Sequence, residues 1–135
     1  MAGYSGTPLG KKLGIKPGVR LLPVTAPADY LKMIAPLPED VTLVRGAASE
    51  LDIVHVFVQR RRELQVALKK YKARIKQNGA IWVSWPKRAS KVPTDITEDT
   101  IREICLPMGL VDIKVCAVDE TWSGLKLVIR KENRK

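Results

Sequence analysis

Two almost uninterrupted apolar runs constrain the fold of this chain more than any other feature. The run Asp52–Val58 reads DIVHVFV and the run Ala80–Trp85 reads AIWVSW, so both are rich in β-branched and aromatic side chains. Strands that are apolar on both faces are typical of a parallel sheet that is covered on both sides. The two runs therefore predict neighbouring buried strands of an α/β protein.

The segment between the two runs predicts the crossover helix that a parallel strand pair requires. Within Arg60–Gln77 the apolar residues recur at helical spacing, which marks one buried stripe. This stripe consists of Leu64, Leu68, Tyr71 and Ile75. Asn78-Gly79 follows and ends the predicted helix.

Turn and cap signals divide the rest of the chain into further short elements. The predicted strands are Val19–Val24, Val41–Val44, Val111–Val118 and Leu125–Arg130, and the predicted helices are a short one at Thr7-Pro8, Ala28–Ala35 and one capped by Thr97. Too few residues join the last two strands for a parallel crossover, so we expect an antiparallel hairpin there.

This order of elements predicts a single α/β domain over residues 1–135. Alternating strands and helices are typical of a three-layer, mainly parallel, Rossmann-like sheet, here with a C-terminal antiparallel hairpin. The arrangement resembles a trimmed methyltransferase fold. Residues 1–16 are expected to form a turn and a short helix, and residues 131–135 a charged tail.

The loop after the first predicted strand lacks the glycines of a cofactor-binding loop. A G-x-G-x-x-G motif lets the backbone approach a cofactor closely. The corresponding place reads Pro23-Val24-Thr25-Ala26-Pro27-Ala28. We therefore expect no cofactor bound in the usual manner, and a vestigial methyltransferase-like protein is the weaker alternative.

Composition argues against several classes of protein. The chain has no run of about 18 apolar residues and no signal-peptide core, so we expect a cytoplasmic protein that does not enter the membrane. Cys105 and Cys116 are too few for a zinc site, and both lie in apolar patterns typical of buried, reduced thiols. No spacing indicates a metal centre or a catalytic triad.

A basic loop follows the strand that ends at Trp85, and it is the best candidate for a ligand site. In open α/β sheets, ligands bind beyond the carboxyl ends of strands. Lys and Arg donate charge-assisted hydrogen bonds to phosphate or carboxylate groups, and Trp stacks on planar groups. If the tip of the C-terminal hairpin adjoins the loop, it contributes two more residues. The candidate ligand-binding residues are Ser84, Trp85, Lys87, Arg88, Lys91, Thr94, Asp119 and Trp122. The alternative is a solvated crossover loop whose tryptophans cover the core.

The net charge of +10 makes nucleic acid an alternative partner. Much of the excess lies in the predicted long helix, where eight cations stand against Glu63 alone. Such a field attracts polyanions and weakens with salt, although long charged side chains also coat helix surfaces that bind nothing. The eight candidate residues are Arg60, Arg61, Arg62, Lys69, Lys70, Lys72, Arg74 and Lys76.

His55 is the only histidine, and in an alternating strand it shares a face with Ile53 and Phe57. A general base needs a carboxylate to orient it, and neighbouring Asp52 faces the other side. We therefore expect a core histidine that is satisfied by one hydrogen bond.

Four segments together carry a family resemblance. They are Tyr4–Leu9 with Lys11–Gly14, Ile81–Lys87, Val115–Asp119 and Thr121–Lys126. With these segments the chain resembles the bacterial domain-of-unknown-function 3052 family over nearly its whole length. The resemblance implies no catalytic residue, but its segments include both loops singled out above.

Taken together, these features predict a non-catalytic binding or regulatory module. Its expected ligand is an anionic small molecule or an acidic protein partner at the loop after Trp85. Nucleic-acid binding through the basic helix is the alternative.

Overall fold

The computed structural model describes residues 7–135, and the segment Tyr4–Gly6 of the family resemblance lies outside them. The strands are β1 (Arg20–Val24), β2 (Thr42–Leu43), β3 (Leu51–Phe57), β4 (Ile75–Pro86), β5 (Leu110–Ala117) and β6 (Trp122–Ile129). The α-helices are α1 (Leu9–Lys12), α2 (Tyr30–Ile34), α3 (Arg61–Lys72) and α4 (Glu98–Cys105). These elements follow the predicted order.

The strands form one six-stranded sheet in the order β2-β1-β3-β4-β6-β5. The first four strands in this order are parallel to one another, whereas β6 runs antiparallel to both of its neighbours. The predicted mainly parallel sheet with a C-terminal antiparallel hairpin is confirmed. Among the described residues, no helix has the length and apolar character needed to cross a bilayer.

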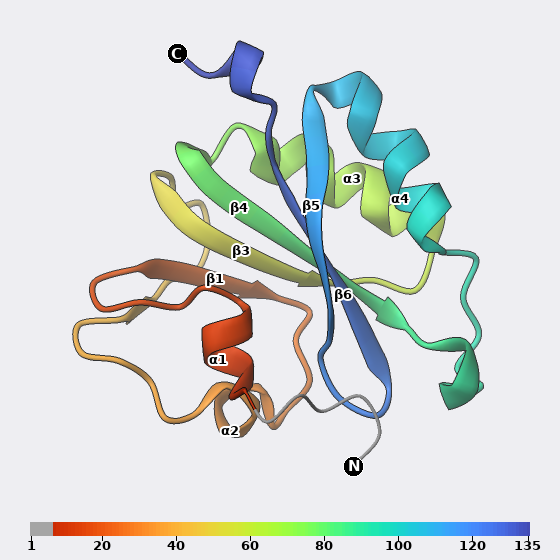
Figure 1. Cartoon of the computed structure of the whole chain (residues 1–135), viewed down its shortest axis with the longest axis horizontal. Coiled ribbons are helices and arrows are strands. Elements are labelled where there is room, and N and C mark those ends of the chain that lie inside the picture. The colour runs from red at the N-terminus through yellow and green to blue at the C-terminus, as the bar shows by residue number, and fades with distance from the viewer. Residues whose placement is uncertain (1–6) are drawn as a thin grey trace.

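Helices cover both faces of the sheet (Figure 1), and a separate core fills each side. On the side of α3 and α4, here called the α4 face, the core includes the buried stripe of α3 and alternate residues of β3 and β4. On the side of α1 and α2, here called the α1 face, Trp82 is fully buried. Its indole nitrogen donates a 2.9 Å hydrogen bond to the carbonyl oxygen of Leu13, which anchors the end of α1 to the sheet.

Helix α3 ends at Lys72, earlier than predicted, so the expected helix Arg60–Gln77 is wrong at its C-terminal end. Ile75 begins β4 and pairs with Leu51 of β3. Because Ile75 is buried in this strand as it would be on a helical stripe, its apolar character does not distinguish the two structures. Gly79 allows the close approach, since a Cβ there would lie 2.8 Å from the carbonyl oxygen of Leu51.

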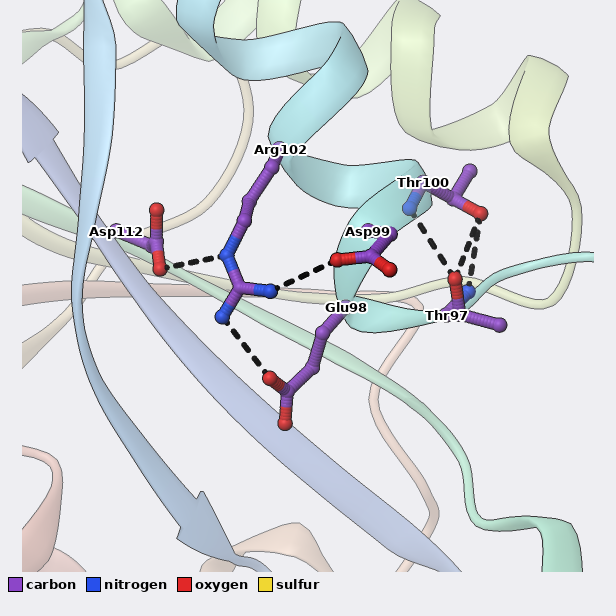
Figure 2. A network of polar contacts seen from close by, with 6 residues as sticks. All are labelled: Thr97, Glu98, Asp99, Thr100, Arg102 and Asp112. Atoms are coloured by element: carbon purple, nitrogen blue, oxygen red, sulfur yellow. Dashed lines mark hydrogen bonds and ion pairs between the residues drawn. The ribbon is translucent and has the colours of Figure 1, made fainter.

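Helix α4 begins as predicted, with Thr97 as its N-cap. The Thr97 hydroxyl accepts a 3.2 Å hydrogen bond from the backbone nitrogen of Thr100, which satisfies one of the free N–H groups of the first turn. Arg102 then joins the helix to β5 through Asp112 and also binds Glu98 and Asp99 (Figure 2). These carboxylates raise the pKa of Arg102, chiefly through the hydrogen bond that its guanidinium donates to Asp112, so its charge is permanent.

Candidate functional site

The end of β4 and the tip of the β5–β6 hairpin lie together, as the candidate ligand site required. Pro86 pairs with Trp122, and the backbone nitrogen of Lys87 donates a 2.7 Å hydrogen bond to the carbonyl oxygen of Thr121. The two tryptophans nevertheless face opposite sides of the sheet. Trp85 is buried in the core of the α4 face, whereas Trp122 packs edge-on against Phe57 on the α1 face. They therefore form no common stacking surface.

Three polar side chains of the predicted site are bonded within the protein. The Thr94 hydroxyl donates to the carbonyl oxygen of Gln59 at 2.6 Å, and Asp119 accepts from the backbone nitrogens of Thr121 and Trp122 at 2.8 and 2.7 Å. Ser84 is fully buried. Thr94 and Asp119 stabilise loops and Ser84 bonds His55 in the core, so these side chains do not offer a ligand the free polar groups that the sequence predicted.

The basic side chains of the same loop remain accessible. Arg88 and Lys91 are exposed in and just after a short 3-10 turn, and Lys87 is half-buried. Among residues 7–135, none of these three cations forms an ion pair. They are the part of the predicted site that an anion can reach.

His55 is fully buried and makes two hydrogen bonds rather than the single one expected. Its Nδ1 lies 2.9 Å from the Tyr30 hydroxyl, and its Nε2 lies 2.7 Å from the Ser84 hydroxyl. Burial lowers the pKa of His55 to about 3 and raises that of Tyr30, so both groups stay neutral. The three residues join α2, β3 and β4, and a neutral, inaccessible imidazole is a structural element rather than a general base. The apolar run around His55 predicted its burial, but no local pattern could identify partners 25 and 29 residues away.

A groove on the α4 face was missed by the sequence analysis. A cavity of about 390 Å³ forms its part at the carboxyl ends of β1 and β3, next to α3. A second cavity of about 400 Å³ continues beside β1, between the segment after β2 and the end of α3, and the two cavities share Val24, Lys70 and Tyr71. The chain leaves β1 through α2 on one face and leaves β3 through α3 on the other. Such a switch point between adjacent strands is where α/β sheets bind ligands.

The groove is open because the crossover from β2 to β3 contains no helix. This connection passes β1 as the segment 44–50, and only Val44 and Ala48 pack on the core of the α4 face. The sequence predicted no helix between the strands at Val41–Val44 and Asp52–Val58, but the position of this connection over β1 depends on the strand order.

Cations surround this groove, which we call the switch-point groove. Arg62 and Lys70 of α3 border one cavity, and Arg45, Lys70 and Arg74 border the other. Lys70 and Arg74 also lie 5.3 and 5.8 Å from the ring centre of Tyr71. Glu63 is the acidic residue at the groove, and its Oε1 already accepts the backbone N–H groups of Gln59 and Arg60 at 2.9 Å. The groove is therefore cationic around an apolar floor.

The eight cations proposed for nucleic acid do not share one surface. Lys76 lies in β4 and pairs with Asp52, and Arg61 pairs with Glu103. Lys69 and Lys72 border a cavity near the C-terminus, away from the switch-point groove. The segment Arg60–Gln77 is a helix, a turn and the start of a strand, so the eight cations do not lie on one continuous helix as predicted.

The thiols have different surroundings. Cys105 is buried, and burial raises its pKa to about 11. Cys116 is free and half-buried, and burial also raises its pKa.

Among residues 7–135, no three His, Cys, Asp or Glu side chains are grouped as metal ligands.

Comparison with known proteins shows the fold but no closer relationship. No protein-family model matches the chain, and no curated protein matches its sequence. Among solved structures, a putative type 11 methyltransferase from Sulfolobus solfataricus has a TM-score of 0.65 at 12% identity, over 98% of this chain and 96% of that one. A SAM-dependent methyltransferase from Aquifex aeolicus has a TM-score of 0.61 at 16% identity, over 88% and 86%. Fibrillarin from Aeropyrum pernix, solved with natively bound S-adenosyl-L-methionine, has a TM-score of 0.58 at 15% identity, over 89% and 73%. The chain has the Rossmann-like fold of these methyltransferases.

The switch-point groove does not suit the cofactor that this fold implies. S-adenosylmethionine carries a sulfonium cation, and the charged side chains bordering the groove are Arg45, Arg62, Lys70 and Arg74, with Glu63 already bonded. A group of cations repels a further cation. After β1, Thr25 has a φ of 53° and is followed by Ala26 and Pro27, not by glycines that would let a cofactor approach the backbone. The charge of this groove favours an anion.

Proposed function

We propose that this chain is a binding module on a methyltransferase fold and that it binds a nucleoside phosphate in the switch-point groove. One observation carries the proposal: cations from α3, from the turn after it and from the β2–β3 crossover converge on a groove at the switch point. Arginine and lysine are the usual partners of phosphate groups.

The floor of the groove supports a nucleoside rather than a bare phosphate ion. Val24, Val66, Ala67 and Tyr71 supply apolar contact surface, and the cations border it. Small-molecule sites typically combine such an apolar lining with a few polar groups that orient the ligand. A nucleoside phosphate has both an aromatic base, whose flat face packs on apolar surface, and an anionic end.

Calorimetric titration with ATP, GTP, inorganic phosphate and S-adenosylmethionine tests the proposal. We expect binding of a nucleotide that weakens at least about tenfold in Lys70→Glu/Arg74→Glu, because both cations then become anions beside the phosphates. The matched control is Lys87→Glu/Lys91→Glu, which makes the same charge change in the loop after β4 and should alter the affinity less than about twofold.

The control also tests the site predicted from the sequence. Loss of nucleotide binding in Lys87→Glu/Lys91→Glu, with the groove variant unaffected, would move the anion site to the loop after β4. The absence of heat with any of the phosphates would overturn the proposed function at both places.

Methyl transfer is the second candidate, favoured by the likeness to the Sulfolobus methyltransferase over nearly the full length of both chains. In the same titration it requires saturable binding of S-adenosylmethionine. Because Lys70→Glu/Arg74→Glu removes positive charge, it should then strengthen the binding of a sulfonium, the opposite of its effect on a nucleotide.

A further inference from the structure

The α1 face carries a group of lysines. Lys114 of β5 lies directly opposite Lys126 of β6, and Lys12 and Lys114 border the same cavity of about 330 Å³. Lys16 follows α1, and Lys87 follows β4 on the side of Cys116. We call Lys16, Lys87, Lys114 and Lys126 the lysine strip.

A β-bulge brings two of these lysines together. Asp112 pairs with Leu127 and faces α4, but the register shifts by one residue before Lys114, which pairs with Lys126. Residues two apart in a regular strand would share a face. The extra residue, Ile113, therefore lets Asp112 and Lys114 point to opposite sides, and bulges commonly re-aim side chains in this way.

Opposed lysines are unfavourable unless an anion joins them, since like charges directly opposite on neighbouring strands are destabilising. Among residues 7–135, no ion pair or side-chain hydrogen bond engages Lys16, Lys87, Lys114 or Lys126. Burial and the neighbouring charges of Lys114 and Lys16 lower the pKa of Lys126. The strip therefore carries a repulsion that the rest of the fold does not relieve.

Protection of a sheet edge does not account for this arrangement. Lysines on an edge strand prevent pairing with other chains, which is a sufficient reason for Lys114 on β5. Lys126, however, lies on β6, which is paired on both sides by β4 and β5. It also lies opposite Trp82, with its ammonium near Gly14 at the end of α1. A lysine at this inner position needs another explanation.

The length of the strip indicates the kind of anion. Lys126 pairs with Trp82 of β4, and Lys87 follows Trp82 by five residues. At roughly 3.3 Å per strand residue, the backbone positions of Trp82 and Lys87 are about 17 Å apart. One phosphate group does not cover that distance, but several successive phosphates of a nucleic acid do. Lysine ammonium groups hold phosphate as point charges and do not recognise bases.

We propose that the lysine strip binds the sugar-phosphate backbone of a nucleic acid without reading its sequence. The strip lies on the opposite face of the sheet from the switch-point groove. The proposal therefore does not depend on whether the groove binds a nucleotide.

Fluorescence anisotropy with a labelled 20-nucleotide single-stranded RNA and a 20-base-pair DNA, from 50 to 200 mM salt, tests this proposal. We expect binding that weakens with salt, with a log–log slope of about −2 for the RNA if three phosphates are neutralised. Lys114→Glu/Lys126→Glu should weaken binding at least about tenfold at 50 mM salt.

Two further variants control for folding and for net charge. Lys16→Glu/Lys114→Glu changes only exposed positions of the strip and should also weaken binding about tenfold, so the test does not depend on half-buried Lys126. Lys69→Glu/Lys72→Glu makes the same charge change on α3 and should weaken binding by less than about threefold.

Three results would overturn the proposal. They are no binding of either nucleic acid at 50 mM salt, equal losses in the strip variants and the α3 variant, and equally tight binding of poly-glutamate, which would assign the strip to an acidic protein partner.

Discussion

Strand β5 presents opposite electrostatic conditions on its two sides. On the α4 face, Asp112 accepts from Arg102 at 3.0 Å, and the same guanidinium binds Glu98 at 2.9 Å and Asp99 at 3.0 Å. On the α1 face, Lys114 faces Lys126, with no carboxylate of residues 7–135 bound to either. Charges of the first kind join helix to strand within the fold. Charges of the second kind are those that we propose bind a nucleic acid.

The same contrast separates the switch-point groove from the outer surface of α3. Arg61 is neutralised by Glu103 of α4, whereas Arg62 and Lys70 border the groove without an ion pair among the described residues. A count of cations along the helix could not make this distinction. Which cations are free depends on the elements packed beside them.

The largest change in the free energy of unfolding should come from lowering the pH, because the core contains a buried, neutral histidine. Burial holds the pKa of His55 at about 3, below its usual 6.5, so the unfolded chain binds a proton that the folded chain does not. Stability is fully present above pH 6.5 and falls as the pH decreases toward 3, by up to about 1.4 kcal/mol per pH unit. Denaturant unfolding at pH 7, 6 and 5 measures the slope.

His55→Gln is the control for that slope. His55 is the only histidine, and most carboxyl groups titrate below pH 5, so the variant should lose the dependence between pH 7 and 5. An unchanged slope in His55→Gln would assign the dependence to other groups and contradict a neutral, buried imidazole.

Removing the ion pairs of Arg102 on the α4 face of β5 should destabilise the protein. Arg102→Gln leaves Asp112, Glu98 and Asp99 without their common cation, so we expect a lower Tm that salt partly restores by screening the carboxylates. Thermal unfolding of Arg102→Gln beside Arg88→Gln, which removes an exposed cation without an ion pair, measures the difference. Equal Tm values would mean that the Arg102 network contributes nothing to the fold.

Removing the repulsion between Lys114 and Lys126 should stabilise the fold, and this effect should be the smallest of the three. Lys114→Glu places a carboxylate opposite Lys126, and replacing repulsion by attraction across a strand pair should stabilise the fold by about 0.5 kcal/mol. The same variant should bind RNA less tightly. If Lys114→Glu destabilises the protein instead, the two lysines do not repel each other in the folded state.

The strands and their directions could be predicted from the sequence because local patterns determine them. The apolar runs at β3 and β4 identified the buried centre of the sheet, and the short link before β6 identified the antiparallel hairpin. The end of α3 could not be predicted, since Ile75 fits both a helical stripe and a strand.

The candidate site was predicted only in part. The fold class predicts that a site lies beyond the strand ends. The groove itself depends on a β2–β3 crossover without a helix and on cations of α3 and residue 45 that only the folded chain places together. The bulge at Ile113, which turns Lys114 toward Lys126, likewise depends on pairing between strands. Ser84 and Trp85 were expected to contact a ligand, yet strand alternation places both in the cores.

We propose above all that a groove on this methyltransferase fold binds a nucleotide through cations that form no ion pair within residues 7–135. Amide chemical shifts of the ¹⁵N-labelled protein, followed during titration with ATP and then with S-adenosylmethionine, test it most directly. We predict saturable shifts with ATP at Val24, Thr25, Lys70 and Tyr71. Shifts confined to residues 87–91, or saturation by S-adenosylmethionine alone, would contradict it.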